Sequence, residues 1–400
     1  MAAFLGFLNR TYTALNPPDV PRSTDSPLIK FGILGAAKIA STALISPAKT
    51  HPDVVVYGIA ARDLERAQVF AKKHGIEKAY GGPDAYQQLL DDPQIDVVYN
   101  PLPNGLHYEW TMKALLAGKH VLLEKPAANT SEETKHMFSL AKEKGLVLLE
   151  AFHYRFHPVI NRVKQIIDSG EIGKVKSIEH LFTVPTGLLK SDDIRFNFSL
   201  GGGSLMDEGC YILNCTRFLT GSEPISVLSA SVQGADKDPR VDQTTTASLS
   251  FPEDVTATFT CSLGLPPRFG FIPHSLPKNE FKVIGEKGEL FCTFWIIPTF
   301  YHYIEVTTKD GDTMKKRIEK VYRPQDVESG MMRNWMGGEW WTTYRYQLEA
   351  FVDRLKGRSS DIWISAEDSI GNMRAIEMIY EKAGLPSRPT STFQSPSKAQ

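Results

Sequence analysis

Between residues 28 and 152 the chain alternates short apolar runs with amphipathic stretches. The apolar runs predict buried strands, and their sequences are LIKFGIL, VVVYGIAA, IDVVYN, HVLLEKP and LVLLEAF. The stretches between them predict helices because their apolar residues recur at helical spacing, as in LERAQVFAKKHG and YEWTMKALLAG. Ser131 is expected to cap a further helix that has acidic residues in its first turn. Units of this length, with strands that are apolar throughout, predict a parallel sheet covered by helices on both faces.

After residue 152 the pattern changes. A helix is predicted from Pro158, and strand patterns then accumulate in VKSIEHLFTV, ISVLSASVQG, TTTASLSF, VTATFTCSL, EFKVIG and GELFCTFW. The alternation of polar and apolar positions over residues 244–251 predicts an antiparallel sheet with one polar face, and GEKG (285–288) predicts a hairpin turn. Amphipathic helices near 344–357 and 366–383 are expected to pack against the body.

The predicted fold class is an α/β Rossmann nucleotide-binding domain plus an α+β domain with a large, mainly antiparallel open sheet. The first domain covers residues 28–152 and the second covers residues 153–384. Residues 1–27 are expected to form an N-terminal arm that packs its Phe4–Leu8 end on the body, and residues 385–400, rich in Ser and Pro, a flexible tail. The role of the aromatic-rich segment 296–346 is left open. It either packs against the body or forms a subunit interface, or it forms a wall of the substrate site.

Composition limits the partners of the protein. The chain has 400 residues, 42% of them hydrophobic and 23% charged, and a formal net charge of −1. No excess of positive charge favours nucleic acid or an anionic membrane, and no apolar run reaches the ~18 residues that span a bilayer. Cysteines are too sparse for a disulfide framework and lack an obvious metal-binding motif, so we expect reduced thiols, no metal and a cytoplasmic location.

The stretch GILGAAKIA (32–40) joins the first predicted strand to the next helix. Gly35 ends the strand, where a glycine lets the backbone approach a pyrophosphate, and the following helix offers free N–H groups to it. Ala37 stands where such a turn usually has its third glycine. The alternative is an ordinary strand-to-helix turn, but the position after the first strand favours cofactor binding. The expected cofactor-binding residues of the turn are Gly35, Ala36, Ala37, Lys38 and Ile39.

The end of the second strand indicates which dinucleotide binds. NAD sites usually place a carboxylate there for the ribose 2′-hydroxyl, whereas this strand ends in Ala60, Ala61 and Arg62. Arg62 can pair with a 2′-phosphate, and Lys38 adds a second positive charge. Asp63 could serve an NAD ribose, but it is better explained as the N-cap of the next helix. The sequence therefore favours NADP over NAD.

Further motifs follow the later strands, at the edge where ligands bind in such sheets. They are YNPLPNGLH (99–107), EKPAA (124–128) and EAFHYRFHP (150–158), and the second domain adds GGGSLMDEGCY (201–211). With these motifs in this order, the chain resembles the Gfo/Idh/MocA oxidoreductases, named for glucose–fructose oxidoreductase and inositol dehydrogenase. It looks most similar to the branch that holds dimeric dihydrodiol dehydrogenases and NADP-dependent D-xylose dehydrogenases.

The resemblance implies roles for a lysine, a carboxylate and a tyrosine. Lys125 would contact the substrate oxygen near the nicotinamide, and the bond before Pro126 is often cis in the family. Asp207 would bind a sugar hydroxyl. Tyr211, where many members carry histidine, would accept the proton, with a pKa lowered by Lys125 and by a cationic nicotinamide. The alternatives are a surface lysine, an exposed carboxylate and a packed aromatic ring.

Weaker candidates complete the expected site. His153, Arg155 and Arg195 are candidates for substrate binding, although His153 could be structural and Arg195 could brace a loop. Cofactor contacts are also expected after the later strands, at Pro101, Leu102, Asn104, His107, Glu124 and Lys125.

The resemblance implies an NADP-dependent enzyme that moves a hydride between nicotinamide and C1 of an aldose or a vicinal diol. Two alternatives remain: a sugar–sugar oxidoreductase that holds NADP(H) tightly, and a non-enzymatic NADP-sensing protein on the same fold. The open sheet commonly joins subunits in the family, so we expect a homodimer.

Overall fold

The computed structural model describes residues 2–24, 27–265, 277–311, 313–327, 336–358, 360 and 362–394. Its first sheet is parallel, with six strands in the order β3-β2-β1-β4-β5-β6. The strands are β1 Ile29–Leu34, β2 Val54–Ala61, β3 Lys78–Gly81, β4 Val97–Asn100, β5 His120–Leu123 and β6 Leu148–Glu150. The edge strand β3 was not predicted, because its sequence KAYG is half-buried and contains no apolar run.

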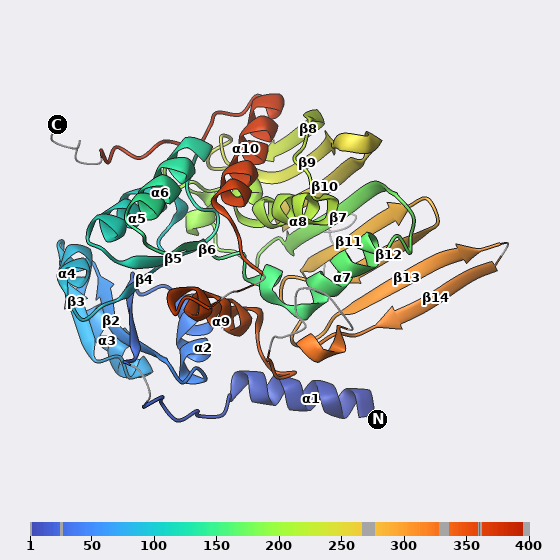
Figure 1. Ribbon diagram of the computed structural model, residues 1–400. Helices are drawn as coiled ribbons and strands as arrows, with labels where there is room; N and C mark the ends of the chain where they lie inside the picture. Colours follow the sequence, from blue (N-terminus) through green and yellow to red (C-terminus); the bar gives the residue numbers. More distant parts are fainter. Residues whose placement is uncertain are drawn as a thin grey trace.

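Helices cover both faces of this sheet (Figure 1). Phe31 on β1 faces the side of α2 and α3, and Leu34 faces the side of α4, α5 and α6. Their bounds are α2 Ser46–Lys49, α3 Leu64–His74, α4 Ala85–Asp91, α5 His107–Leu116 and α6 Ser131–Glu143. Thr130, not Ser131, caps α6, because the Thr130 side chain accepts the N–H of Glu133. None of the helices in the described part of the chain has the length and apolarity needed to cross a membrane.

The strand order reverses between β1 and β4, which lie side by side. Ligands bind at such a switch point, outside the carboxyl ends of the strands. The turn after β1 and the loop after β4 therefore face a common space.

The second sheet has eight strands in the order β14-β13-β12-β11-β7-β10-β9-β8, antiparallel except where β7 pairs with β10. The strands are β7 Val175–Pro185, β8 Ser226–Gly234, β9 Asp242–Ser250, β10 Thr256–Leu265, β11 Lys278–Gly285, β12 Gly288–Thr293, β13 Tyr303–Asp310 and β14 Thr313–Glu319. One face carries α7 Pro158–Asp168, α8 Cys210–Thr220 and α10 Ala366–Ala383 (Figure 1). The predicted fold class is confirmed. The hairpin β13–β14 was not predicted, because most of TMKKRIE is exposed and lacks an apolar face.

The predicted domain limits miss one helix. Helix α9, Thr343–Leu355, lies within the range assigned to the second domain but packs on the first sheet, with the rings of Phe351 and Phe31 6.0 Å apart. Arg345 on α9 also donates to Thr50 Oγ1 at 3.1 Å. The chain thus returns to the nucleotide domain after completing the second sheet.

The two ends of the chain differ from expectation. The arm is a helix, α1 Ala2–Leu15, and it contacts the body through Arg10, which lies 3.6 Å above the Tyr322 ring, while Leu5 and Leu8 are exposed. The side chain of Phe4, part of the predicted contact, lies outside the described residues. Of the predicted flexible tail, residues 385–394 make specific contacts with both domains and are treated below.

Candidate active site

A pocket of about 280 Å³ lies between the carboxyl ends of the first sheet and the loop before α8. Its wall combines residues from the strand ends, from the glycine loop and from the start of α9. They are Ile39, Pro101, Leu102, Asn104, Glu124, Lys125, Ile194, Arg195, Leu200, Gly202, Gly203, Asp207, Tyr211 and Tyr344. Many residues that the sequence assigned to cofactor and substrate therefore meet in one space.

The turn after β1 has the geometry of a dinucleotide cradle. Gly35 has φ +85°, and a Cβ there would lie 3.0 Å from Leu102 Cδ2, so a larger residue would strain the backbone and fill the cradle. Gly32 instead serves packing, since a Cβ would lie 2.7 Å from Leu89 on α4. Lys38 and Ile39 are exposed beyond the turn, at the start of a helical segment that opens with a π-helical turn, Ser41–Ile45. These features fit a bound pyrophosphate at Gly35–Ile39.

Two arginines stand at the end of β2. Arg62 is exposed next to the turn, and Asp63 caps α3 by accepting the N–H of Arg66 at 2.7 Å, as expected. The guanidinium of Arg66 donates to the carbonyl of Ala36 at 3.1 Å. Sequence reasoning missed Arg66, although its position one helical turn after Arg62 was a usable signal. The donor set fits the 2′-phosphate of NADP better than a bare ribose.

Lys125 lies at the centre of an ion cluster. Its ammonium donates to Asp207 Oδ1 at 2.6 Å and to the Asp207 carbonyl at 2.9 Å, and Arg195 Nε donates to Asp207 Oδ2 at 2.6 Å. Burial works against charge on Lys125, but Asp207 outweighs it and raises the pKa of Lys125. Burial likewise opposes charge on Asp207, but Lys125 and Arg195 hold its pKa well below the usual range. Asp207 therefore anchors the lysine, and the predicted contact with a sugar hydroxyl stays a prediction, since Asp207 also lines the pocket.

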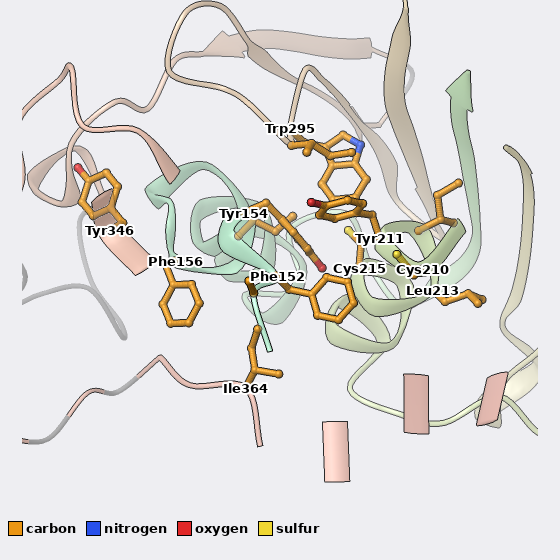
Figure 2. Packing of buried hydrophobic residues seen from close by; sticks show 14 of the residues in the cluster. Phe152, Tyr154, Phe156, Cys210, Tyr211, Leu213, Cys215, Trp295, Tyr346 and Ile364 are labelled. Carbon is orange, nitrogen blue, oxygen red and sulfur yellow. The ribbon is translucent and has the colours of Figure 1, made fainter. Parts of the chain in front are cut away.

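Tyr211 faces the same lysine. Lys125 Nζ lies 4.8 Å from the centre of the Tyr211 ring, and the ring packs with Phe152 and Tyr154 in the buried aromatic cluster of Figure 2. Burial raises the pKa of Tyr211 well above 10, so the lowering that the sequence suggested is not produced by the protein's own groups. The Tyr211 hydroxyl lies next to the ring of His153.

His153 links Tyr211 to helix α9. Its Nε2 lies 2.9 Å from the Tyr211 hydroxyl and its Nδ1 lies 2.7 Å from Thr343 Oγ1. The ring of Tyr344 stacks on it at 4.0 Å. Burial lowers the pKa of His153 to about 3, so the imidazole is neutral at physiological pH. His153 does not line the pocket, and its contacts make it a group that positions Tyr211.

Comparison with known proteins supports the geometry. Residues 29–152 match the model of an oxidoreductase family with an NAD-binding Rossmann fold, and residues 160–291 match the GFO/IDH/MocA C-terminal domain. The chain belongs to the Gfo/Idh/MocA oxidoreductase family. The predicted family and the predicted enzyme class are thereby confirmed.

Family members with named activities align with most of the chain. This chain is 33% identical to an NADP-dependent D-xylose 1-dehydrogenase of Haloferax volcanii, over 88% of this chain and 97% of that one. A trans-1,2-dihydrobenzene-1,2-diol dehydrogenase of Xenopus laevis is 34% identical over 75% of this chain and 84% of its own length.

Solved structures of the family agree with the fold. A 3-ketoreductase of Actinomadura kijaniata in complex with NADP and TDP-benzene has a TM-score of 0.72 at 26% identity, covering 89% of this chain and 98% of that one. An aldose-aldose oxidoreductase of Caulobacter crescentus, complexed with glycerol, has a TM-score of 0.72 at 25% identity, with the same coverage. These relatives agree with the predicted cofactor and with the predicted substrate class.

Two residues that were predicted to contact cofactor or substrate do not line the pocket. His107 is fully buried, and its ring nitrogens lie 2.8 Å and 2.7 Å from the carbonyl oxygens of Pro126 and Leu102. It therefore holds two pocket loops from behind instead of contacting a cofactor. Arg155 points away from the pocket and donates to Asp368 at 2.9 Å, so it is not placed to bind substrate there.

Other residues expected from the Gfo/Idh/MocA resemblance lie at the pocket, and their roles stay predictions. Glu124 lines the pocket and accepts the Tyr99 hydroxyl at 2.6 Å, while burial raises its pKa. The Lys125–Pro126 peptide bond is cis. Asn104 lines the pocket and donates to the Gly201 carbonyl at 3.0 Å, so it joins the two domains at the rim.

Tyr344 lines the pocket and comes from the aromatic segment 296–346, which the sequence left open as a wall of the substrate site without naming this residue. Residues 312 and 328–335 of the segment lie outside the described residues. Within the described residues no group of His, Cys, Asp and Glu could hold a metal ion. The four cysteines are buried free thiols.

Proposed function

We propose that the protein is an NADP-dependent dehydrogenase that moves a hydride between the nicotinamide and a carbinol carbon, C1 of an aldose or one carbon of a vicinal diol. The observation that carries this proposal is the cluster of Lys125, Asp207 and Tyr211 in the pocket that adjoins the Gly35 turn. NADP, when bound, supplies the hydride acceptor.

Lys125 would stabilise the substrate oxygen. Its ammonium is fixed by Asp207 at 2.6 Å, so it stays charged as negative charge develops on the oxygen. The anchoring also costs no reorganisation during the reaction. Arg195, bound to the same carboxylate, keeps Asp207 ionised.

Tyr211 would carry the proton. Because burial raises its pKa, the hydroxyl is protonated at neutral pH and can donate a proton to the alkoxide in the reductive direction. In the oxidative direction the ionised oxygen of Tyr211 would take the proton of the substrate, and the neutral His153, with Nε2 2.9 Å away, orients that oxygen without becoming charged. Thr343 on the other ring nitrogen fixes the orientation of the imidazole.

NADP is preferred to NAD because two arginines, Arg62 and Arg66, flank the turn and no carboxylate follows β2 at Ala60 or Ala61. Asp63, the nearest acid, is engaged as a helix cap. Exchangeable NADP is proposed first. Tight retention of NADP(H), with hydride passed between two sugars, is the second candidate, favoured by the likeness to the aldose-aldose oxidoreductase.

The protein is further proposed to be a homodimer through the open face of the second sheet. This face turns away from α7, α8 and α10, and it exposes alternate residues such as Thr246 and Thr258 (Figure 1). Light scattering coupled to gel filtration tests the stoichiometry. A cytoplasmic location stays a prediction, supported by the unpaired buried cysteines.

The function is tested with a panel of aldoses and vicinal diols in the presence of NADP or NAD, following the absorbance of the reduced nicotinamide. Reduction of added NADP by an aldose or a diol supports the first candidate. Conversion of one sugar with no release of reduced cofactor supports the second. A protein that binds NADPH but converts none of the panel contradicts the proposed substrate class.

A further inference from the structure

The chain that follows α10 crosses from one domain to the other beside the pocket. Residues 385–394, which we term the C-terminal strap, have no regular secondary structure and lie outside both family-model matches. Figure 1 shows this segment running from the end of α10 toward α5 and α6. Its contacts are long-range and specific.

Arg388 fixes the first end of the strap. Only 2% of this residue is exposed, and its Nε donates to the carbonyl of Gly202 at 2.7 Å. The guanidinium also forms an ion pair with the buried Asp242 and donates to the Tyr380 hydroxyl at 2.8 Å. A buried guanidinium with all of these partners is costly to displace, because removal leaves Asp242 uncompensated.

The same ion pair shapes the pocket wall. Gly203 has φ +139°, and a Cβ there would lie 2.1 Å from Asp242 Oδ1. Asp242 Oδ2 accepts the N–H of Leu205 at 2.6 Å and the Ser204 hydroxyl at 2.8 Å. Arg388 and Asp242 thus hold residues 202–205, of which Gly202 and Gly203 line the pocket, and Leu205 begins the turn that carries Asp207.

The other end of the strap is fixed to the nucleotide domain. The Pro389 carbonyl accepts Asn129 Nδ2 at 2.7 Å, and the Ser391 N–H donates to Glu133 Oε1 at 2.6 Å. Phe393 packs beside Tyr108 on α5, with ring centres 6.4 Å apart. Asn129 and Glu133 follow Lys125 by four and eight residues, so this attachment is on the domain that carries the Lys125 wall of the pocket.

We propose that the C-terminal strap sets the distance between the two walls of the pocket and that Arg388 is a positioning residue for cofactor and substrate binding. This inference rests on the proposed function. Arg388 acts through Gly202 and Asp242 and touches no reacting atom. Its loss should therefore weaken binding more than it slows the step in the bound complex.

The test compares Arg388→Met and Arg388→Lys with Arg358→Met in the full-length protein. Arg358 is a matched control, because its exposed guanidinium pairs with Asp353 and forms none of the bonds of Arg388. The Kd for NADPH is measured by fluorescence titration, KM and kcat with the best substrate of the panel, and hydrogen exchange on peptides that cover residues 200–209. Each is measured well below the melting temperature of the variant.

For Arg388→Met we expect an increase of about tenfold in Kd and KM, equivalent to about 1.4 kcal/mol, with kcat changed by less than about threefold. We also expect faster exchange over 200–209, partial recovery in Arg388→Lys and no change in Arg358→Met. A lower melting temperature with unchanged Kd, KM and exchange would assign Arg388 a structural role only and overturn the proposal.

Phe393→Ala keeps the proposal testable if Arg388 variants do not fold. This substitution removes only the outer contact of the strap, with Tyr108 and Lys113. An increase of at least about twofold in the Kd for NADPH, together with faster exchange over 200–209, supports the strap. Unchanged values overturn it. The exchange readout needs no turnover, so failure of the substrate panel remains distinguishable from failure of the strap.

Discussion

On the nucleotide-domain side of the pocket, Gly35, Leu102 and Lys125 come within two residues of the ends of β1, β4 and β5. On the opposite side, Arg195, Asp207 and Tyr211 follow no strand end and are held by side-chain contacts. Backbone pairing places the first set, because parallel strands end at one edge. Partners distant in sequence place the second set, as Lys125 does for Asp207 and His153 does for Tyr211. The proposed reaction takes place between these two sets.

The largest effect is expected where both sides contribute to the reaction. Lys125→Met removes the ammonium and should lower kcat by about 10²–10³. Tyr211→Phe removes only the hydroxyl and should lower kcat by about 10²–10⁴. Steady-state kinetics check both, and NADPH titration checks that the cofactor still binds. Lys135→Met, at an exposed lysine, is the control. Near-normal turnover in Tyr211→Phe would place the proton donor elsewhere.

Removing the ion pair between Lys125 and Asp207, which joins the two sides of the pocket, should change the pH dependence of kcat/KM. Asp207 raises the pKa of Lys125 against the effect of burial, so Asp207→Asn should lower that pKa. Activity that needs the ammonium is present below this pKa and is lost as the pH rises through it. The alkaline limb of kcat/KM should therefore move to lower pH, and the maximum should fall by about tenfold or more.

Asp193→Asn is the matched control for this shift. Asp193 pairs with Arg195 at 3.1 Å, whereas the carboxylate bonded to Lys125 is that of Asp207, so the loss of Asp193 should leave the alkaline limb in place. An identical shift in both variants would mean that the titrating group is not Lys125.

The difference between residues placed by strand ends and residues placed by distant partners explains which site residues could be predicted from the sequence. Apolar runs predicted most strands of the first sheet, and position after a strand predicted Gly35, Arg62 and Lys125. The resemblance to the family added Asp207 and Tyr211, but not the ion pair that ties Asp207 to Lys125. Arg388 could not be predicted, because the C-terminal strap reaches the pocket wall only through tertiary packing. Tyr344 lies in the segment that the sequence left open as a wall of the substrate site, but nothing in the sequence indicated that this residue reaches the pocket. The strap was misread because its Ser and Pro content is typical of loose tails.

Arg62, which the sequence predicted, and Arg66, which it did not, are expected to affect cofactor choice differently. Arg62→Ala should weaken NADP binding about ten- to a hundredfold and leave NAD nearly unchanged, because only NADP carries the 2′-phosphate. Arg66→Ala should weaken both cofactors, since its guanidinium also supports the Ala36 carbonyl of the turn. Fluorescence titration with NADPH and NADH checks both variants. Equal losses for the two cofactors in Arg62→Ala would contradict the assigned phosphate contact.

The prediction with the smallest effect on activity concerns stability and leaves the chemistry alone. Glu150 ends β6 fully buried, and its Oε1 accepts the N–H of Ala127 at 2.8 Å. Burial raises its pKa from 4.5 to about 8. Between these values the carboxyl is neutral in the folded chain and ionised in the unfolded one, so stability is full at low pH and falls as the pH rises through this window. Glu150→Gln removes this dependence, which amounts to about 1.4 kcal/mol for each pKa unit at most.

The free energy of unfolding, measured by denaturant titration at about pH 5 and about pH 8, should therefore fall less in Glu150→Gln than in the native protein. Glu132→Gln, at an exposed carboxylate, should follow the native protein. Parallel falls in Glu150→Gln and the native protein would mean that Glu150 is already ionised in the folded state, and that the end of β6 is more hydrated than its burial indicates.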